Sequence, residues 1–218
     1  MHTDLPETPV AVVAEEQPST GLRRRLIGAG LIGLAGSLVP RLAARAGASP
    51  DTPATTTTAP PKRPTTDDVS LLGFAQSVEL AAVELYQMAV AAQSLGDAAL
   101  AVVTSVQQAH VAYAQSLNAL LGRQAPGTVL TDVVDQFAAD FGGDEASILS
   151  AAYVLEDTAV ATHSELIGQL TGVDGAQLIA SMLIAEARHS AAFADLAGET
   201  DLDTLIFTSA QALEPGEG

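Results

Sequence analysis

The sequence predicts an all-α fold, a four-helix bundle with a long crossover between the second and third helices. From Thr66 onward the apolar residues recur with a helical period, and β-strand signals are weak. Glycine and proline divide this region into four segments of similar length, about 23–28 residues each. Only a few residues join the first segment to the second and the third to the fourth, whereas residues 122–143 separate the two pairs.

The first two helices form a predicted hairpin. The first is expected from about Asp67 to Ser94, a stretch without proline. The second begins near Asp97, which can cap it, and ends at about Leu121, just before Gly122. Helices joined by so short a link pack as antiparallel neighbours.

The third and fourth helices form a second predicted hairpin. The third begins after a Gly-Gly pair, with Asp144 as its N-cap, and ends near Gly172. The fourth opens with Asp174 and Gln177, which have the spacing of a capping box, and ends at Gly198. The bundle is therefore expected over residues 67–198.

Two segments lie outside the four long helices. The crossover between the hairpins contains one amphipathic piece, VLTDVVDQFAADF, and is long enough to cross the whole bundle. The acidic C-terminal tail, residues 199–218, carries one apolar patch, LDTLIF, which we expect to dock on the bundle.

Charge and composition exclude several classes of function. The formal net charge is −17, and only four of the nine basic residues lie after residue 48. Because so acidic a surface repels phosphate backbones, nucleic acid is not an expected partner. The absence of cysteine excludes disulfides, thiolate metal sites, cysteine nucleophiles and a lipid-modified N-terminal cysteine. The sequence also has no nucleophile elbow or phosphate-binding loop that would indicate a hydrolase.

Residues 1–48 have the pattern of an export signal. The run RRRLI precedes a glycine-rich apolar stretch, Leu26–Val39, which small residues follow. The pattern resembles a twin-arginine signal, which directs folded proteins across the bacterial inner membrane. We expect an exported protein, in the periplasm or cell envelope or secreted. The alternative is an uncleaved membrane tether, although the apolar run of about 14 residues is shorter than the roughly 20 that span a bilayer. Residues 49–66 form a Thr/Pro-rich linker, expected to be extended.

Each predicted helix has an apolar stripe that is interrupted near its middle by a side chain able to bind metal. The interrupting residues are Glu79 in the first helix, His110 in the second, Glu156 in the third, and Glu186 with His189 in the fourth. Because Glu186 and His189 are three residues apart, they share one helical face and can reach the same point.

Bound metal would explain why these residues face the core. An unpaired buried carboxylate costs several kcal/mol, and the nearest cation in sequence, Arg188, points off the stripe. Carboxylate with imidazole suits iron, manganese or zinc, and oxygen-rich sites favour the first two. We therefore predict iron or manganese as the cofactor of the bundle core. Simpler explanations exist for single residues, because a lone Glu-x-x-His is usually solvated and a lone buried histidine is more often hydrogen-bonded. His163, about 10 Å along the helix from Glu156, is expected to support the site from outside or to face solvent.

Three segments carry a resemblance to a known family. LLGFAQSVELAAVELYQ, VLEDTAVATH and AEARHS resemble the first, third and fourth helices of the exported bacterial ferritin-like domain proteins related to desiccation-associated proteins. The resemblance covers about residues 67–198 and implies a ferritin-like four-helix bundle. By the pattern of two-metal members, it implies that Glu79 and Glu156 are terminal ligands, that Glu186 bridges, and that His110 and His189 bind one metal each.

The second helix departs from the family pattern. Gln107 stands where a bridging glutamate is expected, and a neutral amide bridges poorly. A di-metal site and a degenerate single-metal or vestigial site are therefore both open.

Two functions are consistent with this pattern. The first is an exported ferritin-like protein that binds iron or manganese, for metal handling or protection from oxidants. The second is a non-catalytic ferritin-like bundle with a degenerate site, which acts as a structural or protein-binding module of the envelope. The sequence does not decide whether the protein is an enzyme. A homodimer is open, and a storage cage is not expected because the signal and linker would crowd its assembly.

Overall fold

The structure, a computed structural model, describes residues 63–216. These residues form six α-helices and one short 3-10 helix, without a strand among them, so the predicted all-α class is confirmed. The predicted export signal, residues 1–48, and the linker as far as residue 62 lie outside the described residues.

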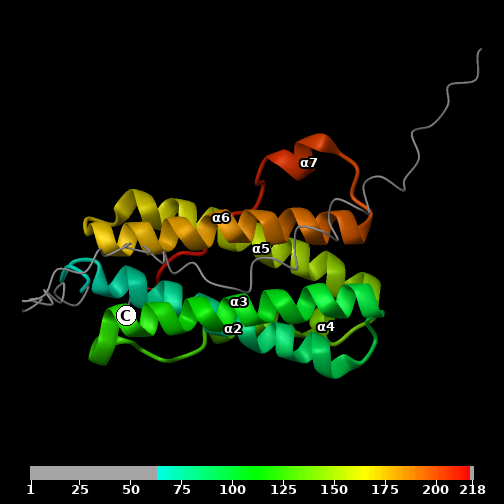
Figure 1. The fold of residues 1–218 in the computed structure, drawn as a ribbon, viewed down its shortest axis with the longest axis horizontal. Helices are drawn as coiled ribbons and strands as arrows, with labels where there is room; N and C mark the ends of the chain where they lie inside the picture. The colour runs from blue at the N-terminus through cyan, green and yellow to red at the C-terminus, as the bar shows by residue number, and fades with distance from the viewer. Residues whose placement is uncertain (1–62, 217–218) are drawn as a thin grey trace, which may run out of the picture. The chain divides into compact units, whose positions relative to one another are not determined.

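Four long helices of 24 or 25 residues form two antiparallel hairpins (Figure 1). The first hairpin consists of α2 (Val69–Ala92) and α3 (Asp97–Leu121), and the second of α5 (Glu145–Gln169) and α6 (Val173–Ala197). All four helices lie within two or three residues of their predicted positions, because the Gly and Asp signals at their ends are strong.

The crossover between the hairpins contains η1 (Gly122–Gln124) and α4 (Thr131–Phe141). It is anchored on α2, where the side-chain oxygen of Gln76 accepts a hydrogen bond from Gly127 N at 3.0 Å. The predicted amphipathic piece is confirmed as α4, which packs on α2 and α5. Its buried residues are Val133, Val134, Phe137 and Phe141.

The capping predictions have mixed outcomes. Asp144 caps α5 as predicted, since its Oδ1 accepts a hydrogen bond from Ser147 N at 2.9 Å. The capping box at the start of α6 is wrong, because the N-cap of α6 is Gly172. The carboxylate of Asp68, which is remote in sequence, accepts hydrogen bonds from Thr171 N at 2.9 Å and Gly172 N at 2.7 Å. Local sequence could not show this cap, which ties the start of α2 to the α5–α6 loop.

A glycine is required at position 172 by this close approach. A Cβ placed there would lie 2.7 Å from Oδ2 of Asp68 and 3.0 Å from Cγ2 of Thr65. Any side chain at this position would therefore push the cap away from the helix that it caps.

The bundle interior consists of two apolar clusters with a polar layer between them. One cluster contains the aromatic rings of Tyr86, Phe141 and Phe193, and the other contains leucines from α2, α3 and α5 together with Ile179 and Met182. On each long helix, the buried acidic or imidazole side chains fall between the residues of one cluster and those of the other. The helices thus bring their polar positions to one level of the core.

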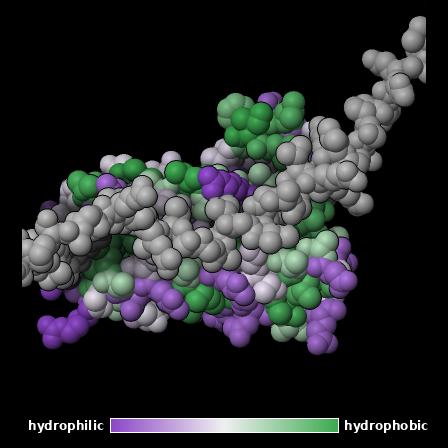
Figure 2. All heavy atoms as spheres, viewed as in Figure 1, coloured by the Kyte–Doolittle hydropathy of each residue, from purple (hydrophilic) through white to green (hydrophobic). Residues whose placement is uncertain are grey.

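The C-terminal tail docks differently from the prediction. The LDTLIF patch contains all of α7 (Leu202–Ile206), and Leu202, Ile206 and Phe207 are 67, 67 and 66% exposed. Figure 2 shows this apolar group on the surface at the position of α7. The tail is instead held by its backbone, since Ser209 N and Ala210 N donate to the Asp157 carboxylate on α5.

Among the described residues, one helix, α2, is long and apolar enough to cross a membrane. Most of its apolar window is buried inside the bundle, as in the core helix of a folded domain. The predicted N-terminal tether lies outside the described residues, so it stays a prediction.

Candidate metal centre

The polar layer contains all five of the predicted site residues. Glu79 on α2, His110 on α3, Glu156 on α5 and Glu186 on α6 are buried. The side chain of His189, also on α6, is 15% exposed and is the most open of the five. The helical stripes therefore predicted correctly which side chains meet in the core, and their metal-binding role stays a prediction.

A sixth residue, His163 on α5, completes the layer. It is fully buried, and its Nδ1 lies 2.6 Å from Oε2 of Glu186. Its burial rules out the solvent-facing alternative, while its contact with Glu186 leaves the other alternative, a residue that supports the site from outside, as a prediction. Two turns of α5, about 10 Å, separate His163 from Glu156, and the two side chains reach different partners in the core.

The six side chains form one chain in which acids and imidazoles alternate. Its order is His189, Glu156, His110, Glu79, His163 and Glu186, and each neighbouring pair lies within ion-pair distance. The chain begins and ends on α6 and passes through all four long helices. Every imidazole therefore has a carboxylate beside it.

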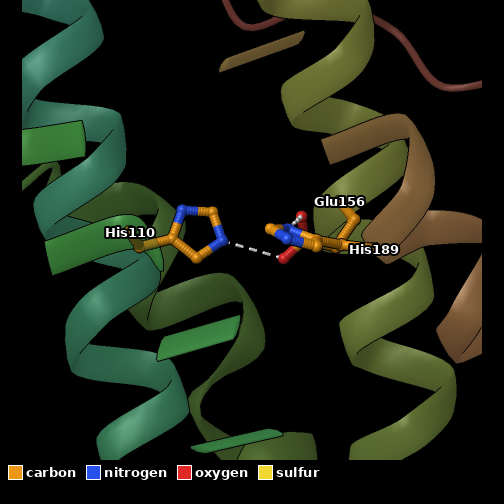
Figure 3. Close-up of side chains that lie close together, drawn as sticks. All are labelled: His110, Glu156 and His189. Atoms are coloured by element: carbon orange, nitrogen blue, oxygen red, sulfur yellow. Dashed lines mark hydrogen bonds and ion pairs between the residues drawn. The ribbon is translucent and has the colours of Figure 1, made fainter. Parts of the chain in front are cut away.

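His110 is at the centre of this chain. Its Nδ1 lies 2.7 Å from Oε2 of Glu79, and its Nε2 lies 2.9 Å from Oε1 of Glu156. Figure 3 shows His110 pointing across the core toward Glu156, with His189 beside that carboxylate. The Nδ1 of His189 lies 3.1 Å from Oε2 of Glu156. Both oxygens of Glu156 are therefore in contact with an imidazole.

Tyr86 holds the same carboxylate from α2. Its buried hydroxyl donates a hydrogen bond to Oε1 of Glu156, and its ring stacks on His110 with centroids 5.5 Å apart. The Tyr86 hydroxyl was not predicted to take part in the site. Such a contact depends on the packing of α2 against α5, which the sequence does not display.

The other end of the chain has unused atoms. Among the described residues, three buried side-chain nitrogen or oxygen atoms lack a hydrogen-bond partner: Oε1 of Glu79, Nε2 of His163 and Oε1 of Glu186. Nε2 of His163 lies 3.6 Å from Oε1 of Glu79, which is too long for a hydrogen bond. Because an unsatisfied buried polar atom costs about 1–3 kcal/mol, three on neighbouring residues indicate a missing partner.

The six residues divide into two groups, each of which could hold a metal ion. One consists of His110, Glu156 and His189, and the other of Glu79, His163 and Glu186. In each group, one ligand atom per residue lies within 4.8 Å of the others. The grouping differs from the arrangement that the family resemblance implies, because Glu186 belongs to one group with His163 rather than lying between two metals.

The pKa values show how the metal-free layer distributes its protons. Burial would raise the pKa of Glu156, but the imidazoles of His110 and His189 outweigh it and hold this pKa well below its usual range. Burial would likewise lower the pKa of His110, but the carboxylates of Glu156 and Glu79 raise it well above the usual value. Glu156 is therefore ionised and His110 carries a proton.

The pKa values of His163 and Glu186 are both raised. Burial raises the pKa of Glu186 to about 7, against the opposing effect of His163. The pKa of His163 is also raised, because Glu186 and Glu79 outweigh the effect of burial. Both groups thus release a proton at a higher pH than they would in water.

Three residues near the site in sequence do not join the layer. Glu84 on α2 is half-buried, and Arg188 is exposed, as its position off the stripe predicts. Gln107 is half-buried on α3, one turn before His110. No carboxylate from α3 enters the layer, and His163 from α5 brings the number of possible donors to six.

The comparisons agree with this architecture. The family model of the ferritin-like domain matches residues 67–199. The crystal structure of hypothetical protein MJ0754 from Methanococcus jannaschii is similar, with a TM-score of 0.56 and 12% sequence identity, over 73% of this chain and 91% of that chain. At this identity the likeness shows the fold alone. No curated protein matches the chain.

Proposed function

This chain belongs to the ferritin-like domain family, and on that premise we propose that its bundle core binds iron or manganese. The observation that carries the proposal is the set of three unsatisfied buried atoms on Glu79, His163 and Glu186. These atoms come from three helices and belong to residues that lie within reach of a single ion. A bound cation would satisfy all three together.

The donor chemistry fits this class of metal. The layer offers carboxylate oxygens and imidazole nitrogens and no thiolate, since the chain has no cysteine. Imidazole with carboxylate suits iron, manganese or zinc, and a larger share of oxygen favours iron and manganese. Such ions supply redox chemistry toward oxygen or peroxide when bound.

The residues of this chain would orient the donors and keep water out. Hydrogen bonds fix the orientation of imidazole rings and of carboxylates in the layer. The ring of His163 is held by Glu186, and the carboxylate of Glu156 is held by Tyr86. When one ring nitrogen of a histidine is hydrogen-bonded in this way, the other ring nitrogen is the one that is free to bind metal. The two apolar clusters close the layer on either side, and His189 provides its most exposed side.

We propose metal handling or protection from oxidants in the cell envelope as the biological role. Support for the location comes from the sequence of residues 1–48, with its arginine run, apolar stretch and small residues. Mass spectrometry of the full-length chain, expressed in bacteria and recovered outside the cytoplasm, tests this part of the proposal. A mature N-terminus close to residue 48 supports export with cleavage, an intact N-terminus in the membrane fraction supports a tether, and protein confined to the cytoplasm contradicts both.

A non-catalytic bundle is the second candidate, and one observation favours it. His110, Glu156 and His189 are hydrogen-bonded to one another, so these three residues have partners without a metal ion. The neutral Gln107 on α3 is consistent with such a degenerate site. This protein would serve as a structural or protein-binding module.

Metal content separates the two candidates. We expect full-length protein from bacteria grown with iron and manganese to contain about one or two metal ions per chain, measured by inductively coupled plasma mass spectrometry. Glu79→Gln should lose most of this metal, because it removes a charge from the layer. Glu84→Gln is the matched control, since it makes the same change on the same helix outside the layer. Metal-free wild-type protein, or equal metal in both variants, would overturn the proposal in favour of the second candidate.

A further inference from the structure

We infer that the polar layer is two unlike ion sites that fill in order, first at Glu79, His163 and Glu186, and then at His110, Glu156 and His189. The inference rests on the proposed function, since it assigns an order and a role to residues of the same layer. It makes His163 a metal ligand, although the family pattern gives this position no role.

The first group can take an ion without losing a contact. Glu79 has Oε1 free while its Oε2 contacts His110. Glu186 has Oε1 free while its Oε2 contacts Nδ1 of His163. His163 in turn has Nε2 free. In each residue, therefore, one atom is available and the other fixes its orientation.

This arrangement is the one that metal-binding histidines commonly have. A histidine that binds metal through one ring nitrogen usually donates the other N–H to a carboxylate, which sets its tautomer and orientation. His163 has such a carboxylate in Glu186 and an unused nitrogen beside Glu79. The two carboxylates of this group also match the charge of one divalent ion.

The second group must give up contacts before it can bind. Both ring nitrogens of His110 are already within hydrogen-bond distance of carboxylates. Both oxygens of Glu156 are also in contact, with Tyr86 and His110 on Oε1 and His189 on Oε2. An ion here displaces hydrogen bonds that the first site keeps, and it meets one carboxylate rather than two. The second site is therefore weaker.

His163 also accounts for a layer without a carboxylate from α3. The residue one turn before His110 is Gln107, so the family pattern would leave this site one ligand short. His163 reaches the layer from α5, seven residues after Glu156, and supplies a third donor beside Glu79 and Glu186. The site near Glu186 is thus complete without position 107.

Titration of metal-free, full-length protein with Mn²⁺ alone tests the order, with the unbound ion followed by electron paramagnetic resonance. We expect two binding events in wild type, the first at least 10-fold tighter than the second. His163→Gln should weaken the tight event by at least about 100-fold, more than the loss of a supporting residue costs. His189→Gln is the matched variant and should remove the weak event while leaving the affinity of the tight one within about 2-fold.

A reversed pattern, in which His189→Gln weakens the tight event and His163→Gln spares it, would overturn the inference while leaving the proposed function standing. Equal losses in both variants would overturn it as well, because they would indicate one shared site. No binding to wild type would instead sink the proposed function. If His163→Gln does not fold, Glu186→Gln tests the same group. A titration of wild type with Zn²⁺, followed by ¹⁵N nuclear magnetic resonance, needs no variant. The resonance of His163 Nε2 should show a coordination shift at the first equivalent of Zn²⁺. A shift that appears first on His189 would contradict the order.

Discussion

His110 Nε2 lies 2.9 Å from Oε1 of Glu156, and this buried contact joins the first hairpin to the second. The polar layer is therefore part of what holds the two halves of the bundle together, besides being a candidate metal centre. Changes in the layer should affect the stability of the metal-free protein as well as metal binding.

The contacts of Glu156 with His110 and His189 predict that the metal-free protein loses stability in acid. The pKa of Glu156 is depressed in the folded protein, because the imidazoles of His110 and His189 outweigh the effect of burial. Its stabilising contribution is thus fully present above the ordinary glutamate pKa of about 4.3 and is lost as the pH falls below it toward the folded value. The raised pKa of His110 acts in the opposite sense: its contribution is present below about 6.5 and is lost only as the pH rises through the folded pKa.

Urea denaturation of metal-free protein between pH 3 and pH 8 measures this effect. The loss of unfolding free energy below about pH 4.5 should be smaller in Glu156→Gln than in wild type. Glu165→Gln changes an exposed carboxylate on the same helix and should follow wild type. Parallel curves for wild type and Glu156→Gln would show that Glu156 is not the depressed carboxyl.

Removal of the Tyr86 hydroxyl should destabilise the metal-free protein. Tyr86→Phe deletes a buried donor to an ionised carboxylate, and such hydrogen bonds contribute about 1.5–3 kcal/mol. Tyr153→Phe is the control, because its hydroxyl donates to a neutral carbonyl, Thr204 O, at 3.3 Å. Equilibrium unfolding in urea gives both values, and equal losses would argue against a special role for the Tyr86 contact.

The remote cap predicts a stability effect far from the metal centre. Asp68→Ala removes the acceptor for Thr171 N and Gly172 N, and we expect a loss of about 2 kcal/mol or more in unfolding free energy. Asp67→Ala changes the exposed neighbour and should cost less than about 0.5 kcal/mol. Metal content should be unaltered in both variants. A loss of metal in Asp68→Ala at unchanged stability would contradict this account.

A carboxylate at position 107 should strengthen metal binding. Gln107→Glu adds a carboxylate one turn before His110, at the position where the family resemblance implies a bridging ligand. We expect tighter binding of the second Mn²⁺ ion, by about 10-fold or more, and a less stable metal-free protein, because a further charge is brought toward the core. Gln108→Glu, at the adjacent exposed position, is the control and should change neither quantity. Equal effects at 107 and 108 would point to long-range charge alone.

The helical period and the chain punctuation were sufficient to predict the bundle. The apolar stripes correctly placed Glu79, His110, Glu156 and Glu186 in the core, because a stripe at this spacing can face only one way. Contacts between different helices could not be predicted in the same way. The caps at α6, the hydroxyl of Tyr86 and the docking of the tail all depend on residues remote in sequence.

The solvent-facing alternative for His163 was wrong for a specific reason. Its distance along α5 from Glu156 made it look too far from a single shared site. Because the layer extends from His189 to Glu186 through four helices, it contains two groups of possible donors, and His163 belongs to the group with Glu79 and Glu186. How far a buried polar layer extends depends on how the helices pack against one another. The stripe of a single helix carries no information about that packing.

The most direct test of metal binding in the polar layer is anomalous diffraction from crystals of the full-length protein grown with Mn²⁺. Data collected on both sides of the manganese absorption edge locate the ion independently of any assumed ligand. We expect an anomalous peak in the polar layer, in contact with Glu79, His163 and Glu186. An ordered layer without a peak, in which the six side chains keep only their mutual hydrogen bonds at saturating Mn²⁺, would contradict it.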